Sequence, residues 1–145
     1  MQVDKNEHYD FSLKNDYGNV NFYVDNNIIV ADFSGNIDTD ILSVFGEKLI
    51  STTAQFNGNP WGYISDSRKV LAATPEAELL LTKIGKKMQA ANCYISAYVM
   101  TSAIAISQMK RVLNSVGRDG TKCIFSEVES AKQYVIKHLK NSQAD

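Results

Sequence analysis

The chain has 145 residues, of which 44% are apolar and 21% charged, so it can bury a core without a metal or a disulfide. Fifteen basic and sixteen acidic residues give a net charge of −1, which argues against a broad positive surface for nucleic acid or anionic membranes. The start is charged, and no run approaches the roughly 18 apolar residues of a membrane span, which predicts a cytoplasmic protein. Cys93 and Cys123 lie in apolar runs and are expected to be reduced and structural.

The first half of the sequence predicts three strands and a helix. Residues 8–14 alternate apolar and polar side chains, which is typical of a peripheral strand. Residues 20–25 and 28–33 form two stronger strands, and the two asparagines between them suit a tight hairpin because Asn tolerates positive φ. A turn follows, and Asp38 or Thr39 can cap a helix. The apolar residues of this helix recur near the helical period: Ile41, Leu42, Phe45, Leu49 and Phe56.

Three strand and helix pairs complete the chain. The strands are runs of apolar, aromatic and β-branched residues, expected at residues 61–65, 93–100 and 123–125. Each helix after them opens with a hydroxyl residue that can cap it: Thr74, Thr101 with Ser102, and Ser126. Repeated strand and helix units favour parallel strands joined by right-handed crossovers.

The predicted fold is therefore α/β. We expect a mixed, mostly parallel sheet of about four to six strands, with an N-terminal antiparallel hairpin and four main helices packed mostly on one face. The chain is expected to form a single domain over residues 1–145, with residues 1–7 and 141–145 flexible.

Candidate site residues follow the carboxyl ends of the predicted parallel strands, where ligands bind in open α/β sheets. They are Ser34, the polar turn Asp66-Ser67-Arg68, Thr101 and Ser102. Hydroxyls, backbone N–H groups and one arginine at helix starts would suit an anion, or a serine that accepts phosphate. The alternative is that these residues are only caps and turn formers.

A second candidate surface is aromatic. Tyr94 and Tyr98 alternate with the apolar side chains of their strand, and Tyr63 can join them on the same sheet face. A tyrosine-rich face suits partial exposure, as a dimer interface or a shallow ligand site. The alternative is that the N-terminal strand or edge packing covers it.

Catalytic and cofactor signatures are absent from the sequence. His8 and His138 stand in unrelated contexts with no metal-ligand partner at useful spacing. No GxGxxG, GxxxxGK[ST] or GxSxG motif occurs, and the acidic pair and lysine of a phosphoacceptor receiver domain are missing from their positions. We expect no metal, no cofactor and no enzymatic activity.

Three segments resemble the STAS superfamily of anti-sigma factor antagonists, in its SpoIIAA-like branch of small stand-alone bacterial proteins, which is structurally related to lipid-binding CRAL-TRIO domains. They are the hairpin leading to IIVADFSG, the segment WGYISDSR leading to a helix, and the ending CIFSEVESAKQYVIKHLK. The likeness covers nearly the whole chain after about residue 8. It implies a STAS-like fold.

In that family a partner kinase phosphorylates a serine in an Asp-Ser pair after a central strand, and the resemblance implies this role for Ser67 after Asp66. The family's glycine is replaced by Arg68, and a phosphate beside Arg68 could instead order the turn by pairing with it. The first hypothesis is therefore a non-catalytic regulatory module whose partner is a kinase or an anti-sigma-type regulator. The second is a carrier of an acidic or lipidic ligand held between the aromatic sheet face and the helices. An enzyme ranks third.

Overall fold

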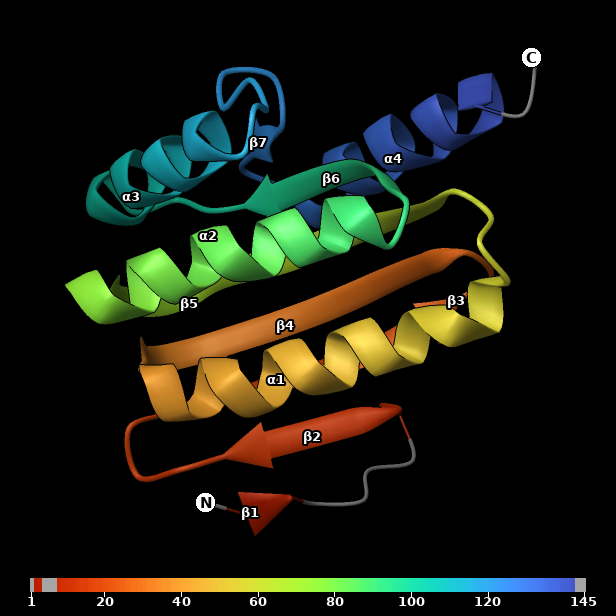
Figure 1. The fold of residues 1–145 in the computed structure, drawn as a ribbon. Helices are drawn as coiled ribbons and strands as arrows, with labels where there is room; N and C mark the ends of the chain where they lie inside the picture. The colour runs from red at the N-terminus through yellow and green to blue at the C-terminus, as the bar shows by residue number, and fades with distance from the viewer. Residues whose placement is uncertain (1, 4–7, 143–145) are drawn as a thin grey trace.

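The fold is a seven-stranded sheet with helices on both faces, seen in a computed structural model that describes residues 2–3 and 8–142 (Figure 1). The strands are β1 (Gln2–Val3), β2 (Phe11–Lys14), β3 (Gly18–Asp25), β4 (Ile28–Ile37), β5 (Trp61–Ala73), β6 (Cys93–Val99) and β7 (Ile124–Phe125). The helices are α1 (Thr39–Thr52), with a short 3₁₀ turn η1 (Thr53–Phe56) after it, α2 (Pro75–Ala90), α3 (Ala103–Ser115) and α4 (Val128–Ser142).

The strands lie in the sheet in the order in which they occur in the chain. Pairing is antiparallel from β1 to β4 and parallel from β4 to β7. The β3–β4 hairpin turns at Asn26-Asn27, and Asn26 has the positive φ of 55° that the sequence predicted there. The predicted fold class is confirmed, and the strand count reaches seven because β1 and β7 contribute two residues each.

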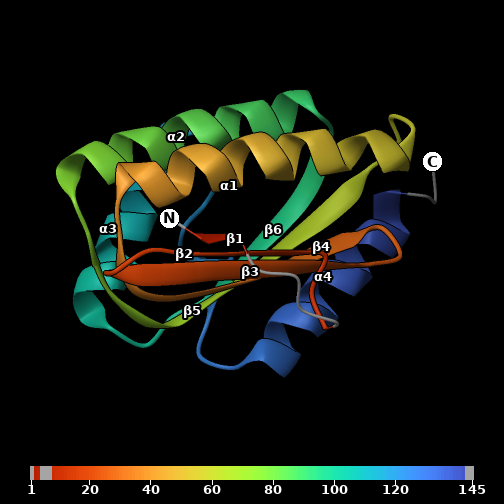
Figure 2. The same ribbon diagram turned by 90° about the horizontal axis from the view of Figure 1, so that it is seen from below.

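Three of the four helices cover one face of the sheet. Each parallel connection moves to the neighbouring strand in the same direction, so α1, α2 and α3 lie together, and α4 lies on the opposite face (Figure 2). The predicted caps form: Asp38 accepts from the N–H of Ile41 at 3.0 Å, and Thr74 accepts from the N–H of Ala77 at 3.1 Å.

Most of the expected flexibility at the termini falls on residues 1, 4–7 and 143–145, which lie outside the described residues. Within the described part, Gln2–Val3 pairs with β2, and α4 continues through Ser142. Helical structure at residues 141–142 therefore replaces the flexible end that the sequence suggested there.

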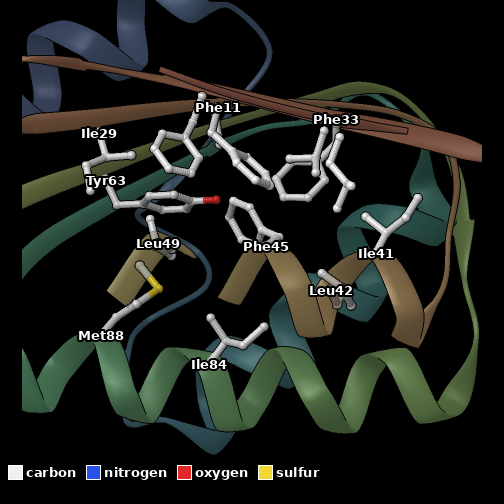
Figure 3. Packing of buried hydrophobic residues seen from close by; sticks show 14 of the residues in the cluster. Phe11, Ile29, Phe33, Ile41, Leu42, Phe45, Leu49, Tyr63, Ile84 and Met88 are labelled. Carbon is white, nitrogen blue, oxygen red and sulfur yellow. The ribbon is translucent and has the colours of Figure 1, made fainter. Parts of the chain in front are cut away.

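The sheet separates two apolar cores. The larger core joins β2–β5 to α1 and α2, and Figure 3 shows Phe45 of α1 reaching toward Phe33 and Tyr63 of the sheet. The Phe45 ring meets that of Phe33 edge-on, with centroids 5.0 Å apart, and it is 1% exposed. The smaller core lies under α4, whose Ala131, Val135 and Leu139 pack on β5 and β6.

β5 is longer than the sequence predicted, and this is the main correction to the fold. The strand was expected to end before a turn at Asp66, but it continues to Ala73. It can continue because β4 also extends through its predicted turn to Ile37, opposite Ala73. Gly35 permits this with φ +81°, where a Cβ would lie 2.5 Å from the carbonyl oxygen of Tyr17.

Phe45→Ala should lower the free energy of unfolding by about 3–5 kcal/mol, because the lost ring leaves a void between helix and sheet. Urea unfolding followed by circular dichroism measures the change. Tyr17→Ala is the control, since the Tyr17 side chain is 68% exposed and its loss should change stability by less than about 0.5 kcal/mol. Equal effects of the two substitutions would contradict the packing described.

Candidate functional site

Asp66 and Arg68 form an ion pair on the outer face of β5, the face on which α4 lies. Arg68 Nε donates to Asp66 Oδ1 at 2.9 Å, and Nη2 donates to Oδ2 at 2.8 Å. The backbone N–H of Arg68 also donates to Oδ1, at 3.2 Å. These hydrogen bonds hold the pKa of Asp66 below its ordinary value. The Asp66 side chain is 22% exposed and that of Arg68 45%, so solvent reaches both members of the pair.

A bulge in β5 adds a second cation to this face. Between Asp32 and Ser34, β4 advances two residues, while opposite them β5 advances three, from Asp66 to Lys69. The extra residue shifts the alternation of side chains, so Lys69 follows Arg68 on the exposed surface. Lys69 favours the ionised forms of both Asp32 and Asp66 through its charge.

Asp32 and Tyr9 belong to the same surface, and the sequence analysis did not select them. Asp32 lies opposite Asp66 in the parallel register, and the Tyr9 hydroxyl donates to Asp32 Oδ2 at 3.3 Å. Burial, and then the charge of Asp66, raise the pKa of Asp32 above its ordinary value. The signal was available for Asp32, because it stands two residues before Ser34 at the end of an apolar strand. Tyr9 carried no such signal.

Ser67 points to the inner face, away from Asp66 and Arg68. It is 7% exposed, and its Oγ lies 3.0 Å from Oγ of Ser65, which is also buried. The expectation of one polar turn at residues 66–68 is wrong, since a continuous strand sends alternate side chains to opposite faces. The structure joins Asp66 to Arg68 and separates both from the Ser67 hydroxyl.

The remaining predicted polar residues have separate surroundings. Ser34 Oγ donates to the side-chain oxygen of Asn19 on β3, and Ser102 caps α3 by accepting from the N–H of Ala105 at 3.4 Å. Thr101 is exposed in the connection before that helix. Ser102 thus makes the cap contact that the sequence analysis gave as the alternative, whereas Ser34 lies within β4 and bonds across the sheet to its register partner Asn19.

The aromatic face is covered by helices, not by the N-terminal strand. Tyr63 is 4% exposed, and its ring lies 6.0 Å from that of the half-buried Tyr98, on the side of α1, α2 and α3. Tyr94 is the exposed member, at 45%. Burial raises the pKa of both Tyr63 and Tyr98. Tyr63 and Tyr98 lie under the helices, so these two rings do not form an exposed dimer interface. The sequence could not show which face the helices cover, because both faces of β6 carry apolar side chains.

The two histidines lie apart in the fold. His8 is exposed, and Nδ1 of His138 lies 2.9 Å from the carbonyl oxygen of Tyr134 in α4. The described residues contain no group of three or more His, Cys, Asp or Glu side chains placed to hold a metal. In the same part of the chain, no helix has the length and apolar character needed to cross a bilayer.

No family model matches the chain, and no curated relative matches it either. Solved structures do. An uncharacterised DUF3478-family protein with a SpoIIAA-like fold, from Shewanella loihica PV-4, aligns with a TM-score of 0.65 and 9% identity over 85% of this chain and 98% of its own. An anti-sigma factor antagonist from Mycobacterium paratuberculosis aligns with a TM-score of 0.55 and 15% identity over 79% and 91%.

The murine anion transporter Slc26a9 is also similar, with a TM-score of 0.59 and 13% identity over 82% of this chain. The alignment spans 18% of the transporter chain. At these identities the likeness shows the fold alone. The protein therefore has the SpoIIAA-like fold, and the sequence resemblance to the STAS superfamily is confirmed at that level.

Arg68→Ala should raise the pKa of Asp66 toward an ordinary aspartate value of about 3.9, because the guanidinium that stabilises the carboxylate is lost. Carboxyl-carbon NMR titration of Asp66 measures the shift. Arg111→Ala removes the arginine of another exposed ion pair, with Glu78, and should leave Asp66 unchanged. An unshifted Asp66 in Arg68→Ala would refute the pairing.

The sign of the pH effect follows from this shift. Because the folded-state pKa of Asp66 is depressed, the pair adds stability above the unfolded value, and that stability is lost as the pH falls through the folded value. The contribution is at most about 1 kcal/mol, since solvent screens the exposed Arg68.

Proposed function

We propose that this protein is a regulatory protein-interaction module of the anti-sigma factor antagonist kind, with no chemistry of its own. Its recognition surface consists of Asp32, Asp66, Arg68 and Lys69 on the outer face of β4 and β5, which we call the charged surface. The observation that carries the proposal is the Asp66–Arg68 pair on the outer face of β5, at the level where the neighbouring strand β6 ends. The likeness to an anti-sigma factor antagonist supports a regulatory class.

The charges of this surface favour recognition over catalysis. Asp66 is kept ionised by Arg68, so it is a poor proton acceptor at neutral pH, and each group already satisfies the other. A partner with charges of both signs can form new ion pairs with Asp66 and Arg68. Breaking the Asp66–Arg68 pair costs little, because an exposed pair contributes at most about 1 kcal/mol. Such exchange gives specificity and fast association more than affinity.

A charge-reversal pair tests the surface. Cross-linking and mass spectrometry in the native host should find a protein partner, a kinase or an anti-sigma-type regulator, with the unmodified chain, and Arg68→Glu should lose it. Arg111→Glu is the control, because it reverses the arginine of another exposed ion pair, on α3. The proposal is wrong if the Arg68→Glu chain keeps every partner of the unmodified chain.

Phosphorylation of Ser67 is a further part of the proposal, and the geometry restricts how it would work. The hydroxyl is buried against Ser65 on the face opposite Arg68, so a kinase can reach it only after the side chain leaves this position. A phosphate carrying about −1.5 to −2 charges could not return to an apolar wall unpaired. Phosphorylation would therefore keep the Ser67 side chain out of its buried position in the middle of β5.

Intact-mass measurement of the protein from its native host tests this step. We expect a fraction of the chain to carry one added phosphate, and Ser67→Ala to abolish that fraction. Ser65→Ala is the matched control and should retain it, because Ser67 then remains available. A phosphate that persists in Ser67→Ala, or its complete absence from the unmodified chain, would show that Ser67 is not a phosphorylation site. The charged surface is tested separately, by the Arg68→Glu experiment.

A further inference from the structure

A cavity of about 80 Å³ lies between the inner face of β5 and β6 and the helices α2 and α3. Since about 10–15 Å³ is enough for one water molecule, this space has room for about five to eight atoms of that size. Figure 3 shows part of its lining, with Tyr63 of β5 pointing toward Phe45 of α1, and with Ile84 and Met88 reaching up from α2. What the cavity can bind is inferred from the residues that line it.

The wall of the cavity is apolar and adaptable. Three of the four methionines of the chain line it, Met88, Met100 and Met109, and their flexible thioethers can adjust to an occupant. Gly85 keeps α2 close to α3, because a Cβ there would lie 3.2 Å from Cγ1 of Val116. A permanently empty space would forfeit dispersion contacts along this whole wall.

The polar groups of the lining determine what the cavity can accept. Ser65 and Ser67 form a buried hydroxyl pair on the sheet side. Glu78 is the acidic residue of the lining, and Arg111 neutralises it with hydrogen bonds of 2.8 and 3.0 Å. The lining contains no lysine or arginine, so an anionic ligand would lose its hydration without gaining a cation.

The helices α2 and α3 meet at the wall of the cavity. The Glu78–Arg111 pair joins these helices there, with the arginine side chain 59% exposed, and Gln108 Nε2 donates to the carbonyl oxygen of Ala73 at 3.1 Å. Breaking an exposed ion pair costs at most about 1 kcal/mol. A small molecule can therefore enter without unfolding the core.

We propose that this cavity binds a neutral, mostly apolar small molecule whose single hydroxyl or carbonyl group bonds to the Ser65–Ser67 pair. The ligand chemistry is thus that of an alcohol or an uncharged lipid fragment, and not of a carboxylate. The site lies on the inner face of β5, while the charged surface lies on its outer face, so it is distinct from the surface proposed to recognise a protein.

NMR of protein labelled with ¹³C in the methionine methyl groups tests the proposal on the isolated chain. The probes are 1-hexanol and hexanoate at pH 7, which match in length and differ in charge. We expect 1-hexanol to shift the Met88, Met100 and Met109 signals saturably, and hexanoate to bind at least about tenfold more weakly. No saturable shift with 1-hexanol, or equal binding of the two probes, would overturn the proposal.

A matched pair of variants locates the binding. Ala105 lines the cavity, whereas Ala103, two residues earlier in α3, is exposed. Ala105→Leu should fill the space and weaken 1-hexanol at least tenfold, and Ala103→Leu should bind it as the unmodified chain does. Thermal unfolding checks that Ala105→Leu is folded. If it is not, the 1-hexanol titration of the unmodified chain still tests whether the cavity binds a ligand. Undiminished binding by folded Ala105→Leu would overturn the site. The titration contains no partner protein, so its result does not depend on whether the charged surface recognises one.

Discussion

Parallel pairing of β4 with β5 is the constraint on which the rest of the structure depends. It runs from Ile28 opposite Gly62 to Ile37 opposite Ala73 and forms the centre of the sheet, with the hairpin on one side and β6 on the other. Both faces of these strands are buried in their first halves, where they separate the core under α1 and α2 from the core under α4. Gly62 permits the second packing, since a Cβ there would lie 2.5 Å from Val135 Cγ1.

The same pairing places the carboxylates of Asp32 and Asp66 side by side, and their pKa values are shifted in opposite directions. Asp66 faces Arg68 and is held ionised, whereas burial and the charge of Asp66 oppose ionisation of Asp32. Because the pKa values of the two groups move in opposite directions, the surface has a fixed negative charge beside one that is easier to neutralise. Such an arrangement contributes little to stability, because both groups are partly exposed to solvent.

Much of the fold follows from local patterns in the sequence. The asparagine turn and the caps at Asp38, Thr74 and Ser102 all depend on interactions within a few residues, and each was predictable. The length of β5 was not, because it depends on pairing with a distant segment of β4 through a glycine that sequence patterns assign to a turn.

The candidate site was predictable in its location but not in its composition. Asp66 and Arg68 were found because polar residues follow an apolar strand. Asp32 and Tyr9 joined them only through strand register and a contact between segments 23 residues apart. The face on which Ser67 and Tyr63 lie could not be read from alternation, because both faces of the central strands are apolar enough to be buried.

The bulge in β5 gives Arg68 a role that its exposed position conceals. The extra residue lies between Asp66 and Lys69, and its position determines which neighbours in this stretch turn inward. Moving the irregularity back by one residue would turn Ser67 outward and send Arg68 into the apolar interior, where a guanidinium without a partner cannot be accommodated. The charge of Arg68 therefore favours the observed position of the bulge, in which the Ser67 side chain is buried.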